Sequence, residues 1–394
     1  MKSIKKFNEV DKKYVNSFFD EENRHRPWVK DFEDSFGEAY NTKYNIACAN
    51  GTAALHSAIV ACGVGPGDEV IIPAISVIMD AWAVVEAGGT PIFADVDKNS
   101  HLISLDSIKS KYSNKTKAII VISWDGLSCD MDPIMEFAKE KNIYVIDDCS
   151  RSVLAYYKDK LVGTIADIST FSFQMKKHIT TGSEGGLIVS NNEELALKAR
   201  RFAGIGYKHF VPDQGVTNLS LESVQNPEYK RFGFFGLNYR MNDLSAAMGM
   251  AQIERMAEIV DWRKHCGESF YNIVKEFDWI IPQSADYDHV HSYYTFSFIN
   301  ECSEKFGISW LDFYKSFKAK GGDGFYSCVA VPFTEPAFKN FINDEIKHQI
   351  SDCDVALSIQ KKIMCFKTNY RNEDDLNRNC FALQELCKEI DKND

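Results

Sequence analysis

Short apolar runs alternate with longer amphipathic stretches up to about residue 250 of the chain. The apolar runs are rich in β-branched residues and cover residues 44–49, 69–74, 90–96, 118–123, 143–148 and 185–190. Between them, residues 51–63, 78–87 and 131–141 have apolar positions at helical spacing. Continuous apolar strands that alternate with helices predict a mainly parallel sheet covered by helices on both faces, which is an α/β fold.

Different patterns precede and follow these alternating elements. Residues 1–25 are polar and predict an N-terminal arm, followed by a helix that docks on the body through Trp28, Phe32 and Phe36. Residues 205–235 are polar, aromatic and weakly periodic. We expect them to form a long ordered loop. A loop of this length in a compact domain is usually functional.

The last third of the chain predicts a smaller α+β lobe. A helical pattern covers residues 244–277, a strand pattern covers 291–300, and further helical patterns cover 308–321 and 375–390. We therefore expect an N-terminal arm at 1–25, a large domain at 26–255 and a small C-terminal domain at 256–394.

Composition and charge exclude several classes of protein. The 394 residues exceed the usual size of one compact domain, and 45% hydrophobic with 26% charged residues is ordinary for a globular protein. The net charge of −11 argues against nucleic acid or an anionic membrane as a partner, because both need a positive surface. No apolar run approaches the roughly 20 residues that cross a bilayer. The N-terminal residues also lack the apolar stretch of a signal peptide.

The cysteines and histidines do not predict a metal site. The 11 cysteines form no C-x-x-C pair and have no zinc-like spacing. Reduced thiols in a cytoplasmic protein are therefore the simplest interpretation. His289 and His291 are close in sequence, but they lack acidic or thiol partners at a useful spacing.

The segment from Ile143 to Ser190 carries the most specific chemistry. Asp147 and Asp148 end a buried strand, and ligands of open α/β sheets bind beyond the carboxyl ends of the strands. Farther along, residues 169–190 combine a strand, a serine, two adjacent lysines, a histidine and a glycine-rich turn. This combination suits an aldehyde cofactor with a basic ring nitrogen. A lysine amine can bond to the aldehyde, and a carboxylate keeps the ring nitrogen protonated.

Several short motifs, each weak alone, occur together in a specific order and spacing. They are Asn50 to His56 (NGTAALH), Gly67 to Ile71 (GDEVI), Asp148, Ser172-Phe173 with Lys177, Thr180 to Gly182, Glu184 to Gly186 and Gly236 to Met241. Together they resemble the DegT/DnrJ/EryC1/StrS family of sugar aminotransferases, over most of the chain and most strongly from Tyr44 to Ser190. The resemblance implies fold type I of the enzymes that depend on pyridoxal 5′-phosphate. That fold has a large lobe, with a mainly parallel seven-stranded sheet between helices, and a smaller α+β C-terminal lobe.

The resemblance implies which residues hold the reactive parts of the cofactor. Lys177, five positions after Ser172, matches the lysine that bonds to the aldehyde. The adjacent Lys176 is the competing candidate, but the spacing from the serine favours Lys177. Asp148 matches the carboxylate that binds the ring nitrogen. Asp147 points to the opposite side of the strand if the pleat persists, so we expect it to act as a strand-end cap.

The cofactor phosphate has a matching set of residues in the same chain. Ser172 matches a hydroxyl that binds the phosphate. Gly51, Thr52 and Ala53 match the start of a helix, where free N–H groups and the helix dipole hold an anion. Without the other motifs, these three residues would predict only an ordinary helix start.

A further motif implies that two chains build each site. Asn238 matches a residue that the family supplies to the phosphate across the subunit interface, which implies a homodimer with shared active sites. The alternative is a loop asparagine that closes a turn. Arg240 could contact an anionic substrate group or anchor the interface, and the sequence does not rank these roles.

The chain departs from the family pattern around the cofactor ring. Arg151 stands where members usually have a glutamine near the phenolic oxygen, and a cation pointing inward there would stabilise the phenolate. Binding of a substrate carboxylate or phosphate is the alternative for Arg151. Val77 aligns with the aromatic residue that usually stacks on the ring. Either an aliphatic residue covers the ring or Trp82 replaces the aromatic, with a core position as the alternative for Trp82.

The resemblance implies an aminotransferase that uses an amino-acid donor, glutamate or glutamine. We expect the amino group to go to a keto group of a nucleotide-linked deoxy sugar, for a surface glycan or a related product. A smaller keto substrate, such as a keto-cyclitol or a phosphorylated keto-triose, is the alternative if Arg151 and residues 205–235 close the sugar pocket.

Two other functions remain as alternatives. Some family members carry histidine in place of the lysine and dehydrate a sugar, and His178 directly follows Lys177. We favour amino transfer because an amine remains at the lysine position. His178 is then a candidate substrate contact, or it packs beneath the turn. A cofactor-binding regulator without turnover is less favoured, because the lysine, the aspartate and the phosphate-binding residues are all present.

Overall fold

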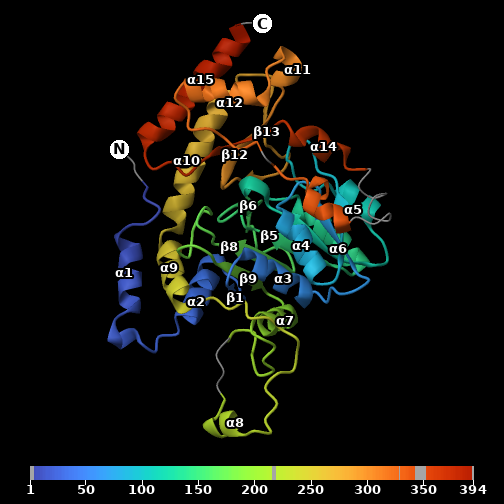
Figure 1. Cartoon of the computed structure of the whole chain (residues 1–394), viewed down its shortest axis with the longest axis vertical. Coiled ribbons are helices and arrows are strands. Elements are labelled where there is room, and N and C mark those ends of the chain that lie inside the picture. Colours follow the sequence, from blue (N-terminus) through green and yellow to red (C-terminus); the bar gives the residue numbers. More distant parts are fainter. Residues whose placement is uncertain (1–3, 215–218, 328, 342–351, 393–394) are drawn as a thin grey trace.

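A seven-stranded sheet forms the centre of the structure, a computed structural model that describes residues 4–214, 219–327, 329–341 and 352–392 (Figure 1). The strand order is β1-β9-β8-β5-β4-β2-β3. These strands are β1 (Tyr44–Cys48), β2 (Glu69–Pro73), β3 (Thr90–Ala94), β4 (Thr116–Ile122), β5 (Tyr144–Asp148), β8 (Ile168–Ser172) and β9 (Gly186–Ser190). Each predicted apolar run is a strand of this sheet, and the predicted α/β fold is confirmed.

The sheet is parallel in its larger part and antiparallel at one edge. Strands β8, β5, β4, β2 and β3 run parallel, whereas β9 pairs antiparallel with both β8 and β1. The run over residues 185–190 therefore belongs to the antiparallel edge. Its apolar pattern does not contain this information, because a strand buried on both faces looks the same in either direction.

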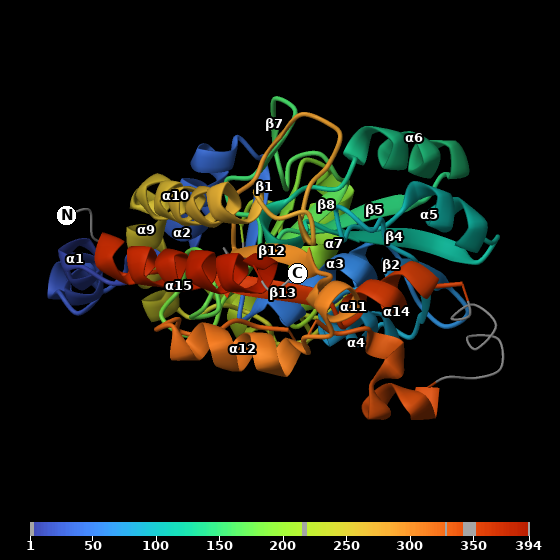
Figure 2. The ribbon, with the colours of Figure 1, turned by 90° about the horizontal axis from the view of Figure 1, so that it is seen from above.

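Helices cover both faces of the sheet. They are α2 (Trp28–Tyr40), α3 (Gly51–Ala61), α4 (Ile78–Glu86), α5 (Leu105–Lys111), α6 (Met131–Lys141), α7 (Glu193–Ala203) and α9 (Asp243–Glu254). On the edge strands, Ile46 and Ile188 pack in one core with α3 and α7, while Ala47 and Leu187 pack in another with α2 and α9. This alternation follows the pleat of the strands. Farther along the sheet, α4 and α6 lie on opposite sides (Figure 2).

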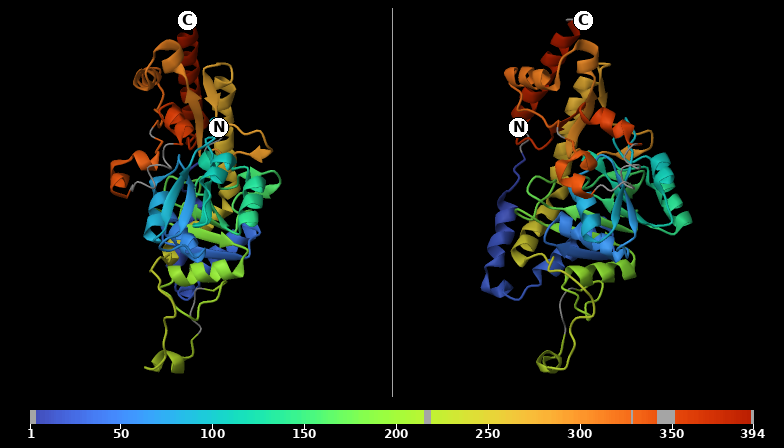
Figure 3. Two further views of the ribbon diagram at one scale, coloured as in Figure 1. Left: turned by 90° about the vertical axis from the view of Figure 1, so that its right-hand side faces the viewer. Right: turned by 45° about the vertical axis from the view of Figure 1, so that its right-hand side comes forward.

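The N-terminal segment contains a helix that the sequence pattern did not predict, α1 (Glu9–Phe18), followed by the short turn η1 (Glu21–Asn23). The Asn8 side chain caps α1 by accepting a bond from the backbone N–H of Val10 at 2.8 Å. Asp11 forms a buried ion pair with Arg255 at 2.8 Å. These contacts hold α1 beside α9 (Figures 1 and 3). The predicted docking helix is α2, with its aromatic residues buried.

The helical pattern over residues 244–277 is two helices, α9 and α10 (Met256–Val274), which meet at Arg255. The Arg255 guanidinium donates to the Asp11 carboxylate and to the backbone carbonyl of Lys5, both at 2.8 Å. The break therefore lies where the N-terminal arm contacts the helix, and apolar periodicity does not reveal such a contact. It also lies at the predicted boundary between the large and small domains, which stays a prediction.

The C-terminal part is built on a second, antiparallel sheet in the order β10-β12-β13. Its elements are α10, β10 (Ile280–Pro282), β12 (Thr295–Asn300), α11 (Cys302–Phe306), α12 (Trp310–Ala319), β13 (Ile363–Lys367) and α15 (Glu373–Lys392). Phe270, Phe298 and Phe366 are central to its core. The short elements η3 (Pro332–Thr334), η4 (Pro336–Phe341) and α14 (Asp354–Gln360) pack on the larger sheet. None of the described helices is long and apolar enough to span a membrane.

Two smaller features lie outside these sheets. Strands β6 (Tyr156–Tyr157), β7 (Lys160–Leu161) and β11 (His289–Val290) form a third sheet in the order β11-β6-β7, which joins segments far apart in sequence. The described part of residues 205–235 forms a long loop that projects away from the body (Figures 1 and 3). Its described part has one short helix, α8 (Leu221–Gln225). The predicted loop is present, and residues 215–218 of it lie outside the described residues.

Candidate active site

A cavity of about 420 Å³ lies where β5 and β8 end and α3 begins, and we call it the strand-end cavity. It joins residues from five separate segments of the chain, and four of them meet because the ends of neighbouring strands share one edge of the sheet. The predicted cofactor residues that line it are Gly51, Thr52, Val77, Asp148, Ser172 and Lys177.

Gly51 allows the start of α3 to approach the end of β8. A Cβ atom at Gly51 would lie 2.7 Å from the Cβ atom of Ser172, which is too close for two carbon atoms. The Asn50 side chain caps the helix by accepting the N–H of Ala53 at 2.8 Å. The N–H groups of Gly51 and Thr52 have no acceptor within the helix, so with the Ser172 hydroxyl they are suited to hold an anion. Ala53 is buried and does not line the cavity.

The two aspartates at the end of β5 lie on opposite sides of the sheet, as the pleat predicts. Asp148 lines the strand-end cavity, and its Oδ1 accepts the backbone N–H of Ser150 at 2.9 Å. Asp147 is fully buried, and the Ser123 hydroxyl donates to it at 3.1 Å. Burial raises the pKa of Asp147 to about 7. Of the two carboxyl groups, only that of Asp148 is positioned to contact a ligand in the cavity.

The two adjacent lysines differ in environment. Lys176 is exposed, whereas Lys177 is half-buried and its Nζ lies 5.3 Å from the centre of the Tyr294 ring. Burial, and next the cation of Arg151, lower the pKa of Lys177 to about 8, although the charge of Asp148 opposes both. A lysine with a pKa this close to neutrality can act as a nucleophile and as a proton carrier. These surroundings favour Lys177 over Lys176.

Sequence reasoning missed a carboxyl group that also lines the strand-end cavity. Asp80, in the first turn of α4, is 1% exposed, and neither of its oxygens has a hydrogen-bond partner among the described residues. Burial, followed by the charge of Asp148, raises the pKa of Asp80 well above its usual range. The available signal was an acidic residue in the first turn of a helix that is otherwise apolar up to its last residue, Glu86, because a buried acidic residue needs a partner or a ligand.

Arg151 belongs to a buried cluster with Trp124 and Asp125 of the turn η2 (Trp124–Gly126). Its Nη1 donates to Asp125 at 2.8 Å, and its guanidinium lies 3.9 Å from the centre of the Trp124 ring. Asp125 is fully buried and has a left-handed φ of 55°. A fixed carboxylate therefore balances the cation, and sequence reasoning did not identify that carboxylate.

A second cavity, of about 480 Å³, adjoins the first and provides room for a substrate. Val77, Lys176 and Tyr294 line both cavities. Arg151 lines only this adjoining cavity, so its guanidinium faces the space beside the cofactor residues. Tyr294 was not predicted, and its ring is the aromatic group that lies near Lys177.

Two predicted contact residues lie outside both cavities. Trp82 packs against Phe338, with the ring centres 5.1 Å apart, which agrees with the core alternative and leaves Val77 at the cavity. His178 is fully buried, and its Nε2 bonds to the backbone carbonyl of Ser292 at 3.0 Å. His178 therefore packs beneath the turn and is not placed to contact a substrate in either cavity.

Asn238 and Arg240 are exposed and line neither cavity of their own chain. The Arg240 Nε donates to the Asn238 Oδ1 at 3.0 Å. Backbone bridges to Gly204 and Cys48 hold the two residues at the sheet edge next to the projecting loop. Within one chain these residues do not complete the site.

The strand-end cavity fits pyridoxal 5′-phosphate. The N–H groups of Gly51 and Thr52 and the Ser172 hydroxyl suit the phosphate, Asp148 suits the ring nitrogen, and Lys177 suits the aldehyde. When bound, this cofactor supplies an electron sink for chemistry at the carbon that carries the amino group.

Comparisons with known proteins agree with this geometry. The model of the DegT/DnrJ/EryC1/StrS aminotransferase family matches residues 7–364. The GDP-perosamine synthase of Escherichia coli O157:H7 is 34% identical over 297 residues, which cover 75% of this chain and 76% of that protein. The GDP-perosamine synthase of Caulobacter vibrioides is 40% identical over 231 residues, 59% of this chain and 57% of that protein. The X-ray structure of an aminotransferase from Psychrobacter cryohalolentis superposes with a TM-score of 0.86, at 27% identity and with 99% of each chain covered.

The family match spans nearly the whole chain, and the cavity residues suit the cofactor of that family. The chain therefore belongs to the DegT/DnrJ/EryC1/StrS aminotransferase family and is an aminotransferase that depends on pyridoxal 5′-phosphate.

Proposed function

We propose that the enzyme transfers an amino group from glutamate or glutamine to a keto group of a nucleotide-linked deoxy sugar, for a surface glycan or a related product. The observation that carries this proposal is a half-buried lysine in a cavity that also holds Asp148 and Ser172, with a second cavity beside it. The two relatives named GDP-perosamine synthase make a GDP-linked keto-deoxy sugar the first substrate to test.

The residues of the cavity have distinct proposed roles. Gly51, Thr52 and Ser172 bind the cofactor phosphate, and Asp148 keeps the ring nitrogen protonated. Lys177 bonds to the aldehyde in the resting enzyme. When released, its Nζ moves a proton at the carbon that gains or loses nitrogen. A pKa of about 8 for Lys177 supports this role, because its neutral and charged forms are then both accessible near neutral pH.

We further propose a homodimer whose sites are shared between the chains. Asn238 and Arg240 line neither the strand-end cavity nor the adjoining cavity of their own chain, and they lie next to a loop with exposed Phe232, Phe234 and Phe235. An apolar patch of this kind is typical of an interface. A cytoplasmic location stays a prediction from the sequence.

The alternatives differ in how the adjoining cavity is used. Arg151 faces that cavity, so a smaller substrate with a carboxylate or phosphate would have a cation to bind, although Asp125 already balances that cation. A dehydratase is less supported, because His178 is turned toward Ser292 and Lys177 occupies the position beside Asp148.

A labelling experiment tests the proposed reaction. The purified enzyme with cofactor is incubated with nitrogen-15 glutamate or glutamine and a GDP-linked keto-deoxy sugar, and the nucleotide product is analysed by mass spectrometry. We expect labelled nitrogen in the sugar. Labelling of a small keto compound alone would favour the alternative substrate. Loss of a sugar oxygen without gain of nitrogen would contradict amino transfer.

A matched pair of variants tests the role of Lys177. We expect Lys177→Ala to abolish labelling and to lose the covalent cofactor link that borohydride reduction traps. Lys176→Ala, which changes the adjacent exposed lysine, should keep the covalent cofactor link, which is the readout of this control because Lys176 lines both cavities. The opposite result would assign the cofactor to Lys176.

A further inference from the structure

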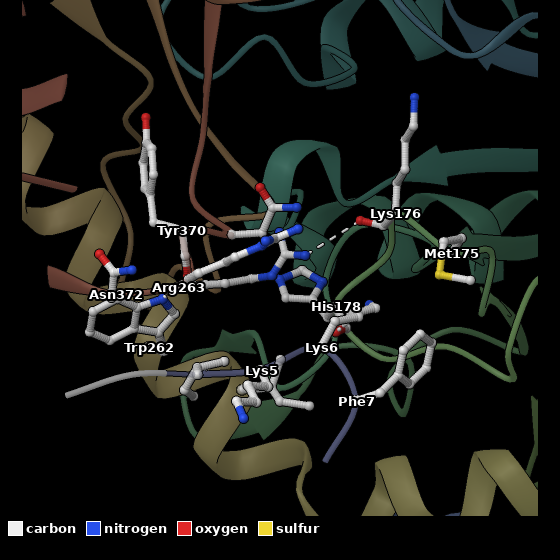
Figure 4. A pocket seen from close by; sticks show the side chains of 14 residues that line it. Lys5, Lys6, Phe7, Met175, Lys176, His178, Trp262, Arg263, Tyr370 and Asn372 are labelled. Atoms are coloured by element: carbon white, nitrogen blue, oxygen red, sulfur yellow. Dashed lines mark hydrogen bonds between the residues drawn. The ribbon is translucent and has the colours of Figure 1, made fainter. Parts of the chain in front are cut away.

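A third cavity, of about 680 Å³, lies on the other side of the turn that carries Lys177 (Figure 4). It is enclosed by residues 4–7 of the N-terminal arm, the turn residues Met175, Lys176 and His178, helix α10 and residues 369–372. It exceeds both cavities of the active site in volume and lies within the range of small-molecule sites. We call it the arm cavity. The proposed active site does not use it.

The arm cavity concentrates positive charge in an acidic protein. The cationic side chains that line it are Lys5, Lys6, Lys176, Arg263 and Arg371, and its described lining includes no aspartate or glutamate. None of these cations forms an ion pair with a described residue, whereas the whole chain has a net charge of −11. Cations gathered without carboxylates repel one another, so an anionic ligand would stabilise the cluster.

Two of these cations are held in place behind the cofactor lysine. The Lys6 Nζ donates to the backbone carbonyls of Lys177 at 2.7 Å and of His178 at 3.3 Å. Arg263 is 3% exposed, and its Nη2 donates to the carbonyl of Lys177 at 3.2 Å. Figure 4 shows Lys6, Arg263 and His178 gathered on the same side of the cavity. The cavity wall is thus the backbone of the cofactor-binding turn.

The carboxyl group nearest to this cluster is already engaged. Asp11 affects Lys6 electrostatically, but its oxygens bond to Arg255 at 2.8 Å and to Gln252 at 2.5 Å. Burial, and next the charge of Arg263, lowers the pKa of Lys6 to about 7. Lys6 therefore lacks a counter-charge that would stabilise its protonated form.

A buried polar group on the lining also lacks a partner among the described residues. His178 is fully buried and lines the cavity, and its Nδ1 has no hydrogen-bond partner while Nε2 bonds to Ser292. Buried polar groups are usually satisfied, so an unsatisfied group beside unpaired cations points to a missing polar ligand.

We propose that the arm cavity binds a small phosphate-bearing anion at a site separate from that of the cofactor phosphate. Lys5, Lys6 and Arg371 supply charge and donors, and Ile4 and Phe7 supply apolar surface. Since Lys6 and Arg263 also hold the carbonyl of Lys177, the bound anion would change how firmly the cofactor turn is held. Binding of a phosphorylated metabolite at this site would thereby regulate the enzyme.

Calorimetric titration of the enzyme with its cofactor bound tests this site, because the cofactor phosphate then occupies the α3 site. Pyrophosphate, GDP and sulfate are the probes. We expect one pyrophosphate per chain. The double variant Lys5→Ala/Arg371→Ala removes two exposed cations at the rim and should weaken binding roughly tenfold or more. Lys13→Ala, which removes an exposed cation of the same arm outside the cavity, should leave binding unchanged.

The probes distinguish the source of the phosphate. If GDP binds more tightly than pyrophosphate, and if GDP binding weakens in the double variant, the ligand is a nucleotide. Equal binding of the two would make it a simple phosphate. Absence of pyrophosphate and sulfate binding, or binding that the double variant does not weaken, would overturn the proposal, even if GDP still bound at the active site.

Titration with sulfate at several pH values adds a test of Lys6, because the charge of sulfate is constant near neutrality. Lys6 faces Arg263, Asp11 and Arg255, and its pKa is about 7. We expect affinity to rise severalfold as the pH falls through about 7, where Lys6 gains its proton. In Lys6→Gln this pH dependence should be lost. An unchanged pH dependence in that variant would contradict the role of Lys6.

Discussion

At the scale of single residues, Asp80 and Asp148 place two carboxyl groups in one buried cavity. Asp148 has a backbone donor, whereas Asp80 has no partner among the described residues. The folded protein therefore favours the protonated form of Asp80. A buried acid of this kind lowers stability when it must ionise, and active sites commonly contain such groups.

We expect Asp80→Asn to stabilise the cofactor-free protein at neutral pH. The pKa of Asp80 is raised in the folded state, so its ionisation opposes folding above about pH 4, and the penalty grows until the pH passes the folded-state pKa. The gain should be about 1 kcal/mol or more near pH 7 and should vanish at low pH. Urea denaturation at several pH values measures it. Asp106→Asn, an exposed first-turn aspartate of α5, is the matched control. Equal effects of the two variants would contradict the prediction.

Arg151 and Asp125 form the other coupled pair at this scale. We expect Arg151→Gln alone to destabilise the protein by about 2 kcal/mol, because it leaves the fully buried Asp125 without a counter-charge. Adding Asp125→Asn to this variant should restore most of the lost stability. A double-mutant cycle from urea denaturation gives the coupling energy. A coupling near zero would mean that the ion pair adds little and that Trp124 stacking holds Arg151.

At the scale of elements, the proposed phosphate site depends on how closely α3 approaches β8. We expect Gly51→Ala to weaken binding of pyridoxal 5′-phosphate about tenfold, because the new Cβ would meet Ser172 at 2.7 Å and move the helix start. Gly65→Ala is the control, since a Cβ there meets no atom within 4 Å. Cofactor titration followed by absorbance measures both affinities. Unchanged affinity in Gly51→Ala would mean that the helix start does not hold the phosphate.

At the scale of the whole molecule, the projecting loop is the candidate contact between chains. Phe235 is 82% exposed on this loop, so we expect Phe235→Glu to shift a dimer toward monomers. Phe19→Glu, at a residue that is 72% exposed near the end of α1, should leave the dimer intact. Sedimentation velocity distinguishes a monomer of 44.7 kDa from its dimer. A wild-type protein that sediments as a monomer would contradict the proposed assembly.

Shared active sites make a further prediction at this scale. Lys177→Ala and Asn238→Ala should each be inactive or strongly impaired. After the two are mixed and the subunits exchange, about a quarter of the wild-type activity should return, because each mixed dimer has one intact site. The labelling assay measures the recovery. Failure to recover activity despite confirmed subunit exchange would place Asn238 outside the partner's site.

The parts of the protein that sequence alone identified are those encoded by local patterns. Apolar runs identified the strands, because neighbours along a strand have a nearly fixed geometry. The family resemblance predicted Lys177 as the cofactor lysine, and that role stays a prediction. The pleat also separated Asp148 from Asp147, and the structure agrees. Family motifs then identified the cofactor and the amino transfer.

Only the tertiary structure decided which distant residues meet. It placed Asp80 beside Asp148, paired Arg151 with Asp125, turned Trp82 toward Phe338, and joined the N-terminal arm to the cofactor turn. Each of these contacts joins segments that are separate in sequence, and no periodic pattern encodes the distance between them. The sequence therefore determined the fold and the core chemistry. The packing of helices and loops around the sheet decided the electrostatics of the site and the presence of the arm cavity, because burial and charge depend on neighbours that only folding brings together.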